Sequence, residues 1–580
     1  MSLAARLRTA LDGLRRRRPL PVWYHEGYRL PLPDGREALG LETRRADMAL
    51  WGLLGARNRR LLEIHEPGRA SFGELQLVHD DAWLERLTRP RDLAQVFGLD
   101  REDFPVGPVL TTVRLAVRGT VAATRHALER GGPTLNLLGG FHHAFPDRGT
   151  GFCPVNDLAI ALAAARAEGF DGDALVLDLD AHPPDGTAAC LEQDERAWIG
   201  SISGSDWGPL PGVDETVLPG ADDATYLAAL RDLLGRLRRP RLAFVLAGGD
   251  VLAGDRLGTL KLTPAGVQER DRLVAAWLDD LPSVWVPAGG YQAEAWRVVA
   301  RTAGVLIGRG FRPVPDELDP IASHFAYVSR SLDAATLHGG EPWITQEEVD
   351  AMFGARSGAR DGRLLGYYTA DGIEHALWAY GFLPLLHRLG YRAFQVEISR
   401  GASGDRAQLT GSAGGERHLL WEIVVDRETV AGHPVLFLNW MTMRHPRGAF
   451  DPRHPRLPGQ EVPGLGLADE AMALLVRVCG RLDLDGILLR PAWLHVAAMG
   501  HPRFRFVDPA HEGRFQALLR DLHDVPLRQL TEAAAAGRLT CDGEPWTWRP
   551  EPMVLWTRPH AEDEAAVATT RDATRFTLAP

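Results

Sequence analysis

The sequence predicts an α/β fold in the first half of the chain, a doubly wound parallel sheet, followed by a separate α+β domain. Short apolar runs alternate with amphipathic segments from about Thr134 to Tyr291, which is the pattern of repeated strand–helix–strand units. The runs are continuously apolar, as expected for strands that helices cover on both faces of a parallel sheet. At 580 residues the chain also exceeds the size at which one hydrophobic core keeps growing, so a second domain is expected.

In chain order, the first domain should contain buried strands with helices between them. The expected strands cover residues 134–138, 174–177, 242–247 and 283–287, and the expected helices cover residues 156–168, 222–237 and 263–281. Pro313, Pro315 and the acidic run that follows mark the end of this pattern. We therefore assign residues 1–315 to the first domain, 316–330 to a linker and 331–580 to the α+β domain.

The second domain mixes strands, at about 393–398, 419–426 and 435–440, with helices, one of which should begin at a capping box of Thr345 and Glu348. A glycine loop at 460–466 precedes an amphipathic segment, 468–482, and a strand-like run, 486–490.

Such a loop can present backbone N–H groups to a phosphate, and the order is similar to the acetyl-CoA loop of the GNAT superfamily. In this chain an extra residue separates Gln460 from Gly464. The similarity implies that Leu465 and Gly466 would lie at the pyrophosphate of an acyl-CoA. An ordinary turn with a helix cap is the alternative.

Composition and charge argue against three classes of protein. The net charge of −11 disfavours a general nucleic-acid binder, and no apolar stretch approaches the ~18 residues of a membrane span. The N-terminus lacks the apolar core of a secretory signal, and the four cysteines are scattered without a CxxC pair, which disfavours a disulfide framework. We expect a soluble cytoplasmic protein without membrane or nucleic-acid partners.

Polar clusters follow all of the expected strands of the first domain. They are Gly139-Gly-Phe-His-His143, the segment 178–185, Gly248-Gly-Asp250 and Gly289-Gly-Tyr291. Because the carboxyl ends of parallel strands meet at one edge of a sheet, these clusters should converge in one crevice.

Asp180, His182 and Asp250 are the predicted ligands of one divalent ion. Side chains alternate faces along a strand, so Asp178, Asp180 and His182 should share one side, where carboxylates are costly without a metal or strong hydrogen-bond donors. Two carboxylates and one imidazole leave coordination positions open for water and substrate. This ligand set is typical of a catalytic metal.

His142 and His143 are a candidate pair for proton transfer, because imidazole titrates near neutrality. One can take a proton from water and the other can give one to a leaving amine, and Asp178 and Asp185 are available to fix their tautomers. Tyr291 offers a phenolic donor to an oxyanion. The candidate walls of an apolar channel for an acyl-lysine-like chain are Phe141, Phe152 and Trp207.

These residues lie in motifs that resemble, in order, the signature of the histone deacetylase superfamily. The motifs are Gly139-Gly-Phe-His-His-Ala144, Gly151-Phe-Cys-Pro-Val-Asn-Asp157, Asp178-Leu-Asp-Ala-His182, Gly249-Asp250 with Gly254-Asp-Arg-Leu-Gly258, and Gly289-Gly-Tyr291. The resemblance covers about residues 20–310, includes His79-Asp-Asp-Ala-Trp-Leu84, and is nearest to bacterial and class IV-like members. It implies an arginase-like α/β fold and hydrolysis of an N-acyl-lysine in a peptide or protein, or of an acetylpolyamine.

The resemblance also implies roles for individual residues. Zn²⁺, or Fe²⁺, would be held by Asp180, His182 and Asp250, with His142 and His143 as the acid/base pair, Tyr291 on the carbonyl oxygen, and Asp178 and Asp185 orienting the histidines. Asp103 would contact the substrate backbone, and Ser201 would belong to a structural K⁺ site.

The chain departs from the family pattern after the ligand histidine, where Pro183-Pro184 replaces His-Gly or Gln-Gly. Two prolines remove two backbone donors and fix φ, and if the turn cannot place Asp185, His143 loses its partner. Ser203 also stands where a histidine is common.

Pro183-Pro184 is the main support for an alternative interpretation, a catalytically weak deacetylase-like domain that binds acyl ligands and is fused to an acyl-CoA-binding or acyltransferase domain. A third, a dinuclear ureohydrolase, is suggested by Asp180-Ala-His182. It is disfavoured because Pro184 stands where the second metal needs a carboxylate and no DxDxxDP motif occurs.

Overall fold

The computed structural model describes residues 18–32, 41–338, 362–448, 450 and 456–579. The chain divides into two compact units, Met1–Ser323 and His324–Pro580, which are described separately below. Within the described residues, no helix is both long and apolar enough to cross a membrane.

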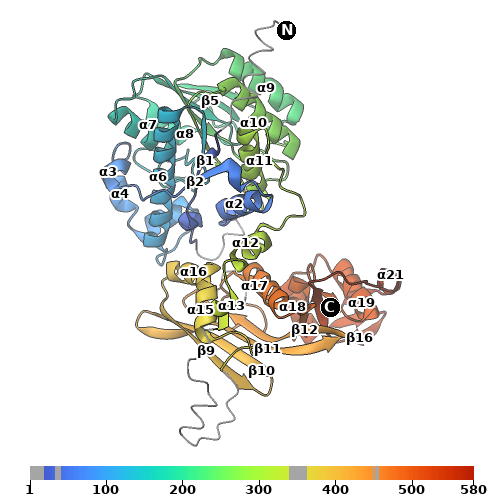
Figure 1. Ribbon diagram of the computed structural model, residues 1–580. Coiled ribbons are helices and arrows are strands. Elements are labelled where there is room, and N and C mark those ends of the chain that lie inside the picture. The colour runs from blue at the N-terminus through green and yellow to red at the C-terminus, as the bar shows by residue number, and fades with distance from the viewer. Residues whose placement is uncertain (1–17, 33–40, 339–361, 449, 451–455, 580) are drawn as a thin grey trace, which may run out of the picture. The chain divides into compact units, whose positions relative to one another are not determined.

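Unit 1 is built on an eight-stranded sheet in the order β2-β1-β3-β8-β7-β4-β5-β6, and every pairing in it is parallel (Figure 1). The strands are β1 (Leu20–Trp23), β2 (Leu62–His65), β3 (Pro133–Asn136), β4 (Ala174–Asp178), β5 (Ala197–Ser203), β6 (Val213–Val217), β7 (Leu242–Leu246) and β8 (Ser283–Val286). The predicted doubly wound parallel sheet is confirmed.

Helices flank this sheet. They are α2 (Arg45–Gly55), α3 (Phe72–Leu75), α4 (Asp81–Arg86), α5 (Pro90–Val96), α6 (Val106–Arg130), α7 (Asp157–Ala167), α8 (Asp185–Leu191), α9 (Asp223–Arg236), α10 (Pro264–Leu278) and α11 (Ala295–Ile307). The side chains of Asn156, Asp222 and Thr263 each accept a hydrogen bond from the backbone N–H three residues later. These caps fix where α7, α9 and α10 begin.

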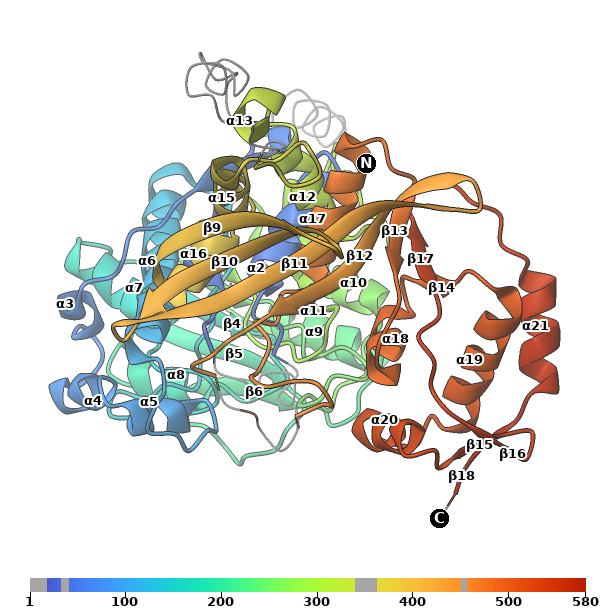
Figure 2. The same cartoon turned by 90° about the horizontal axis from the view of Figure 1, so that it is seen from below.

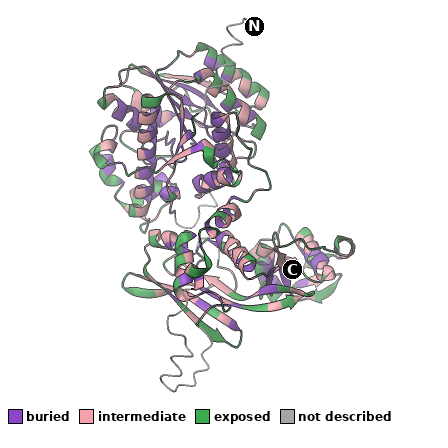
Figure 3. Ribbon diagram, in the orientation of Figure 1, coloured by how far each residue is buried: buried purple, intermediate pink, exposed green. Residues whose placement is uncertain are grey.

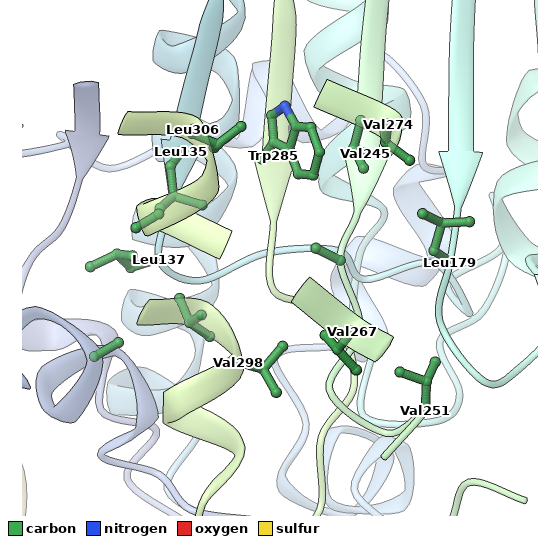
Figure 4. Close-up of a cluster of buried hydrophobic side chains, with 14 of the residues drawn as sticks. Leu135, Leu137, Leu179, Val245, Val251, Val267, Val274, Trp285, Val298 and Leu306 are labelled. Atoms are coloured by element: carbon green, nitrogen blue, oxygen red, sulfur yellow. The ribbon is translucent and has the colours of Figure 1, made fainter. Parts of the chain in front are cut away.

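The central strands bury both of their faces (Figure 3). Alternate residues of β4 and β7 divide between two hydrophobic clusters. One cluster contains Leu175 and Val245 and packs against α2, α9, α10 and α11 (Figure 4), and the other contains Val176 and Phe244 and packs against α6 and α7. This division explains why these strands are continuously apolar in sequence.

Unit 2 is α+β. Its main sheet has the order β14-β17-β13-β12-β11-β10-β9, with strands β9 to β12 antiparallel and β12 parallel to β13 (Figure 2). The strands are β9 (Arg392–Gly401), β10 (Gly404–Ala413), β11 (Glu416–Val430), β12 (His433–Met443), β13 (Gly486–Leu489), β14 (Arg505–Phe506) and β17 (Met553–Trp556); a second sheet pairs β15 (Leu539–Cys541) with β16 (Glu544–Trp546) and β18 (Phe576–Leu578).

The described helices of this part of the chain are α12 (Pro320–Ser329), α13 (Ala334–His338), α15 (Ala370–Ala379), α16 (Phe382–Arg388), α17 (Ala468–Arg481), α18 (Leu494–Gly500), α19 (Pro509–Asp521), α20 (Leu527–Ala535) and α21 (Glu564–Ala573). The predicted capping box at Thr345 and Glu348 lies outside the described residues.

The predicted glycine loop lies between β12 and α17, and α17 connects the parallel pair β12 and β13. The first turn of α17 contains Asp469 and Glu470. Negative side chains at a helix N-terminus oppose the binding of a pyrophosphate there. Binding of an acyl-CoA by this loop stays a prediction.

The segment predicted as a linker, 316–330, contains helix α12. The carboxylate of Asp319 accepts hydrogen bonds from the backbone N–H groups of Ile321 and Ala322, at the start of the helix. Phe325 is fully buried and stacks on Tyr380, with ring centroids 4.7 Å apart. Spaced apolar residues behind a capping aspartate therefore form a helix here despite the flanking prolines.

Candidate active site

The polar clusters after β4 and β7 bring Asp180, His182 and Asp250 together. One ligand atom from each of these side chains lies within 4.8 Å of the other two. His182 Nδ1 lies 3.1 Å from Asp180 Oδ1 and 3.1 Å from Asp250 Oδ2. Both aspartates are buried. Two buried carboxylates facing one imidazole nitrogen form a donor set that fits a divalent cation.

Backbone donors hold the two carboxylates in place. Gly289 N–H donates to Asp180 Oδ2 over 2.6 Å, and Ala181 N–H donates to Asp250 Oδ1 over 3.1 Å. A side chain at Gly289 would clash with Oδ2 of both aspartates. The glycine after β8 is therefore required by the close approach of the backbone to the two carboxylates.

The electrostatics of this group also favour a cation. Burial and the neighbouring Asp180 carboxylate raise the pKa of Asp250. Burial lowers the pKa of His182, but its hydrogen bonds with Asp180 and Asp250 outweigh this effect and raise it to about 11. The group thus attracts positive charge, which a metal ion would supply in place of protons.

His142 and His143 each pair with one carboxylate. His142 Nδ1 lies 2.8 Å from Asp178 Oδ2, and His143 Nδ1 lies 2.7 Å from Asp185 Oδ1. The ring centroids are 4.0 Å apart. Each pairing orients the imidazole through Nδ1, so that Nε2 is the nitrogen left for proton transfer.

The two histidines have opposite pKa shifts. Burial lowers the pKa of His142, but the carboxylates of Asp178 and Asp180 outweigh it and raise the pKa to about 9. Burial and the positive charge of His142 lower the pKa of His143. Environments that separate the pKa values of neighbouring groups are typical of an acid and a base that work together.

The two prolines after His182 do not displace Asp185. Pro184 is the residue before α8 and Asp185 is its first residue, and Asp185 N–H donates to Pro183 O over 3.0 Å. Proline is well tolerated at a helix start, because the first N–H groups of a helix need no partner within it. The loss of the His143 partner that the prolines could have caused does not occur.

Aromatic rings stand beside this group of residues. The ring centroids of Phe152 and Tyr291 are 5.5 Å apart. Trp207 is half-exposed, and its ring centroid lies 5.3 Å from that of His143 and 6.1 Å from that of His182. Phe141 is buried in the hydrophobic cluster that contains Leu175 and Val245.

Comparison with known proteins agrees with this geometry. The histone deacetylase domain family matches residues 41–304. The chain is 33% identical over 316 residues to an uncharacterized protein of Picosynechococcus sp., covering 51% of this chain and 99% of that protein. It is 32% identical over 268 residues to histone deacetylase 2 of Arabidopsis thaliana, covering 43% of this chain and 68% of the relative. The chain belongs to the histone deacetylase family.

Human histone deacetylase 1 is a more distant relative, 26% identical over 300 residues, which cover 46% of this chain and 60% of the human protein. The resemblance seen in the sequence motifs is thus confirmed. Membership of the histone deacetylase family supports a deacetylase-like hydrolase activity.

Two further predicted site residues, Ser201 and Asp103, have different surroundings. Ser201 pairs with Asp178 across β5 and β4, and its buried hydroxyl has no hydrogen-bond partner among the described residues. An orphaned buried oxygen fits a cation ligand. Asp103 is exposed, and both of its carboxylate oxygens accept hydrogen bonds from Arg101 over 2.8 Å.

Ser203, which replaces a histidine common in the family, is also accounted for. Its hydroxyl lies 2.8 Å from Glu215 Oε1 on β6, so the position serves a strand-to-strand contact.

Two residues that the sequence reasoning missed support the turn after β8. Arg45 on α2 donates to Gly289 O over 2.9 Å and to Ala288 O over 2.6 Å. Asp255 accepts a hydrogen bond from Tyr291 N–H over 2.7 Å. The Gly254–Gly258 motif contained a signal for Asp255. No sequence signal pointed to Arg45, because it is 244 residues from Gly289 and its partners are backbone carbonyls.

Proposed function

We propose that this chain is a zinc-dependent deacylase that hydrolyses the amide of an N-acyl-lysine or of a related acylated amine such as an acetylpolyamine. The observation that carries the proposal is the grouping of Asp180, His182 and Asp250 beside two histidine–aspartate pairs. Zn²⁺ suits this ligand set, and Fe²⁺ is the alternative ion. When bound, the ion would supply a Lewis acid that polarises the acyl carbonyl and acidifies water.

The protein's own groups would then move the protons. His143, with its lowered pKa, is suited to accept the proton of the attacking water, and His142, with its raised pKa, is suited to donate one to the departing amine. The amide C–N bond breaks, the water oxygen bonds to the carbonyl carbon, and the products are a carboxylate and a free amine.

Tyr291 would donate a hydrogen bond to the oxyanion. Burial, together with the Asp180 and Asp250 carboxylates, raises the pKa of Tyr291 well above its usual value. The phenol therefore keeps its proton across the physiological range, which suits a fixed hydrogen-bond donor.

The surroundings of the site support an acylated chain as substrate. Phe152 offers apolar surface beside Tyr291, and Trp207 offers it beside His143, which fits the methylene chain of a lysine or polyamine. We also propose that Ser201 contributes to a structural K⁺ site and that the protein works in the cytoplasm.

The test is hydrolysis of a panel of acetyl-lysine peptides and acetylpolyamines by the full chain. We expect wild-type activity that a chelator removes and Zn²⁺ restores, and no activity in Asp180→Ala. Asp232→Ala, the same change on the exposed surface of α9, is the matched control and should behave as wild type. Undiminished activity in Asp180→Ala would refute the proposal.

A further inference from the structure

Helix α10 carries a buried ion pair that the proposed chemistry does not use. Arg270 and Asp271 are both completely buried, and Arg270 Nε donates to Asp271 Oδ1 over 2.9 Å. Buried ion pairs contribute little net stability, because desolvation of the charges offsets their attraction and apolar residues of similar volume often stabilise as well. A fully buried arginine therefore calls for an explanation other than stability.

The guanidinium group contacts the ends of the two strands that precede the metal ligands. Arg270 Nη1 donates to Gly248 O over 2.8 Å and lies 3.3 Å from Leu179 O. Leu179 is the residue before Asp180, and Gly248 is two residues before Asp250. One nitrogen of α10 thus joins the loop after β4 to the loop after β7.

The same two peptide groups are also held on their N–H side. Asp180 N–H donates to Asp178 Oδ1 over 3.1 Å, and Gly249 N–H donates to Gly289 O over 2.9 Å. With the carbonyl and the N–H both engaged, each peptide plane has little freedom to rotate. The first plane ends at the Cα of Asp180, and the second ends at the Cα of Gly249, one residue before Asp250, so the two planes fix the backbone that leads to each ligand.

Asp271 in turn fixes the guanidinium. Its Oδ1 accepts from Arg270, and its Oδ2 accepts from the hydroxyl of Thr302 on α11 over 2.6 Å. The planar fork of arginine can serve a carboxylate and two carbonyls at once, whereas the ammonium of lysine is a single point charge. The network therefore depends on arginine at this position.

We propose that Arg270 is a positioning residue for the metal site, which holds the loops after β4 and β7 at the separation that Asp180 and Asp250 need to share one ion. This role rests on the proposed function. The polar partners of metal ligands typically affect metal affinity by 10- to 100-fold, and Arg270 would act one step further out, through the backbone of the ligand loops.

The test measures the dissociation constant of Zn²⁺ by competition with a chelator in the full chain, for the wild type, Arg270→Met and Arg270→Lys. We expect Zn²⁺ binding weaker by about 10-fold or more in Arg270→Met and a smaller loss in Arg270→Lys. Arg272→Met is the matched control, because Arg272 lies on the same helix with its side chain 57% exposed, and it should bind Zn²⁺ as the wild type does.

The unfolding transition of the metal-free protein is measured in parallel. Weaker Zn²⁺ binding in a variant whose metal-free form unfolds like the wild type supports positioning, since a purely structural role would lower stability and leave the affinity of the folded protein unchanged. If Arg270→Met does not fold, the Zn²⁺ affinity and the metal-free unfolding of Arg270→Lys are compared with those of the wild type in the same way. Wild-type affinity in the folded Arg270 variants refutes this role alone, whereas a wild-type protein that binds no Zn²⁺ refutes the proposed function and this role with it.

Discussion

His79 is a buried histidine whose two ring nitrogens are both engaged by the backbone near the site. Nδ1 lies 3.0 Å from Phe145 O, and Nε2 accepts from Asn156 N–H over 2.9 Å. Asn156 in turn caps α7. These contacts assign the neutral form with the proton on Nδ1. Burial lowers the pKa of His79 to about 4, so protonation must break this arrangement.

We expect His79 to make the stability of unit 1 depend on pH. The folded pKa lies below the unfolded value of about 6.5, so the unfolded chain binds more protons and stability falls as the pH is lowered from 6.5 towards 4. Between pH 7.5 and pH 5 the loss through this residue is about 2 kcal/mol. Urea unfolding of the wild type and His79→Gln at both pH values measures it, and the variant should lose about that much less.

The control for this measurement is His523→Gln, which changes an exposed histidine in unit 2. It should lose the same stability between the two pH values as the wild type. An equal loss in the wild type and in His79→Gln would contradict the assignment of the neutral form to His79.

At the level of single residues, the sequence could predict the side chains that follow strands in one run, such as Asp178, Asp180 and His182. The buried strand before them marked where this run begins, but β4 itself ends at Asp178, so the turn after the strand places Asp180 and His182. It could not predict Arg45 or Arg270, because both act on backbone carbonyls that any sequence provides. Leu179, one partner of Arg270, lies 91 residues away.

Among the elements of unit 1, α8 begins at Asp185 and keeps this residue beside His143, despite the two prolines that depart from the family motif. Pro184 has φ −81°, a value that proline adopts without strain, and both prolines are buried. We expect Pro183→Ala and Pro184→Ala each to lower the free energy of unfolding by about 0.5–1 kcal/mol, mainly because the unfolded chain gains freedom. Because Asp185 stays at the helix start, kcat on an acetyl-lysine peptide should stay close to that of the wild type.

Denaturant unfolding and steady-state kinetics on the same preparations check this expectation. Asp185→Asn is the comparison, since it alters the His143 partner directly and should lower kcat without a similar change in stability. A large loss of kcat in either proline variant would mean that the prolines do more than begin the helix.

The sequence could predict the central strands β3, β4, β7 and β8, because burial on both faces makes them continuously apolar. The other strands of this sheet were not predicted. β2 and β6 are half-buried along most of their length and so lack a continuous apolar run, and β1 contains a proline, which disfavours a strand in a sequence-based prediction.

For the whole molecule, the division into two units raises the question of whether unit 1 alone can form the candidate site. Among the described residues, both hydrophobic clusters of the sheet consist of side chains between Leu20 and Val314, within unit 1. Each residue that we place at the site also lies in unit 1, and the relative from Picosynechococcus sp. is covered over 99% of its length by about half of this chain. Unit 1 thus contains a complete core and a complete candidate site.

We therefore expect residues 1–323 to fold alone, to bind Zn²⁺ with the affinity of the full chain, and to keep kcat/KM on a short acetyl-lysine peptide within about threefold. Circular dichroism, chelator competition and peptide kinetics on both proteins measure these quantities. A truncated protein that folds and binds Zn²⁺ but has lost activity would show that unit 2 supplies part of the substrate site. Equal activity of the two proteins on short peptides would instead show that unit 1 carries out the chemistry alone. This is the result we expect, because the sheet that carries the ligands packs against helices of unit 1.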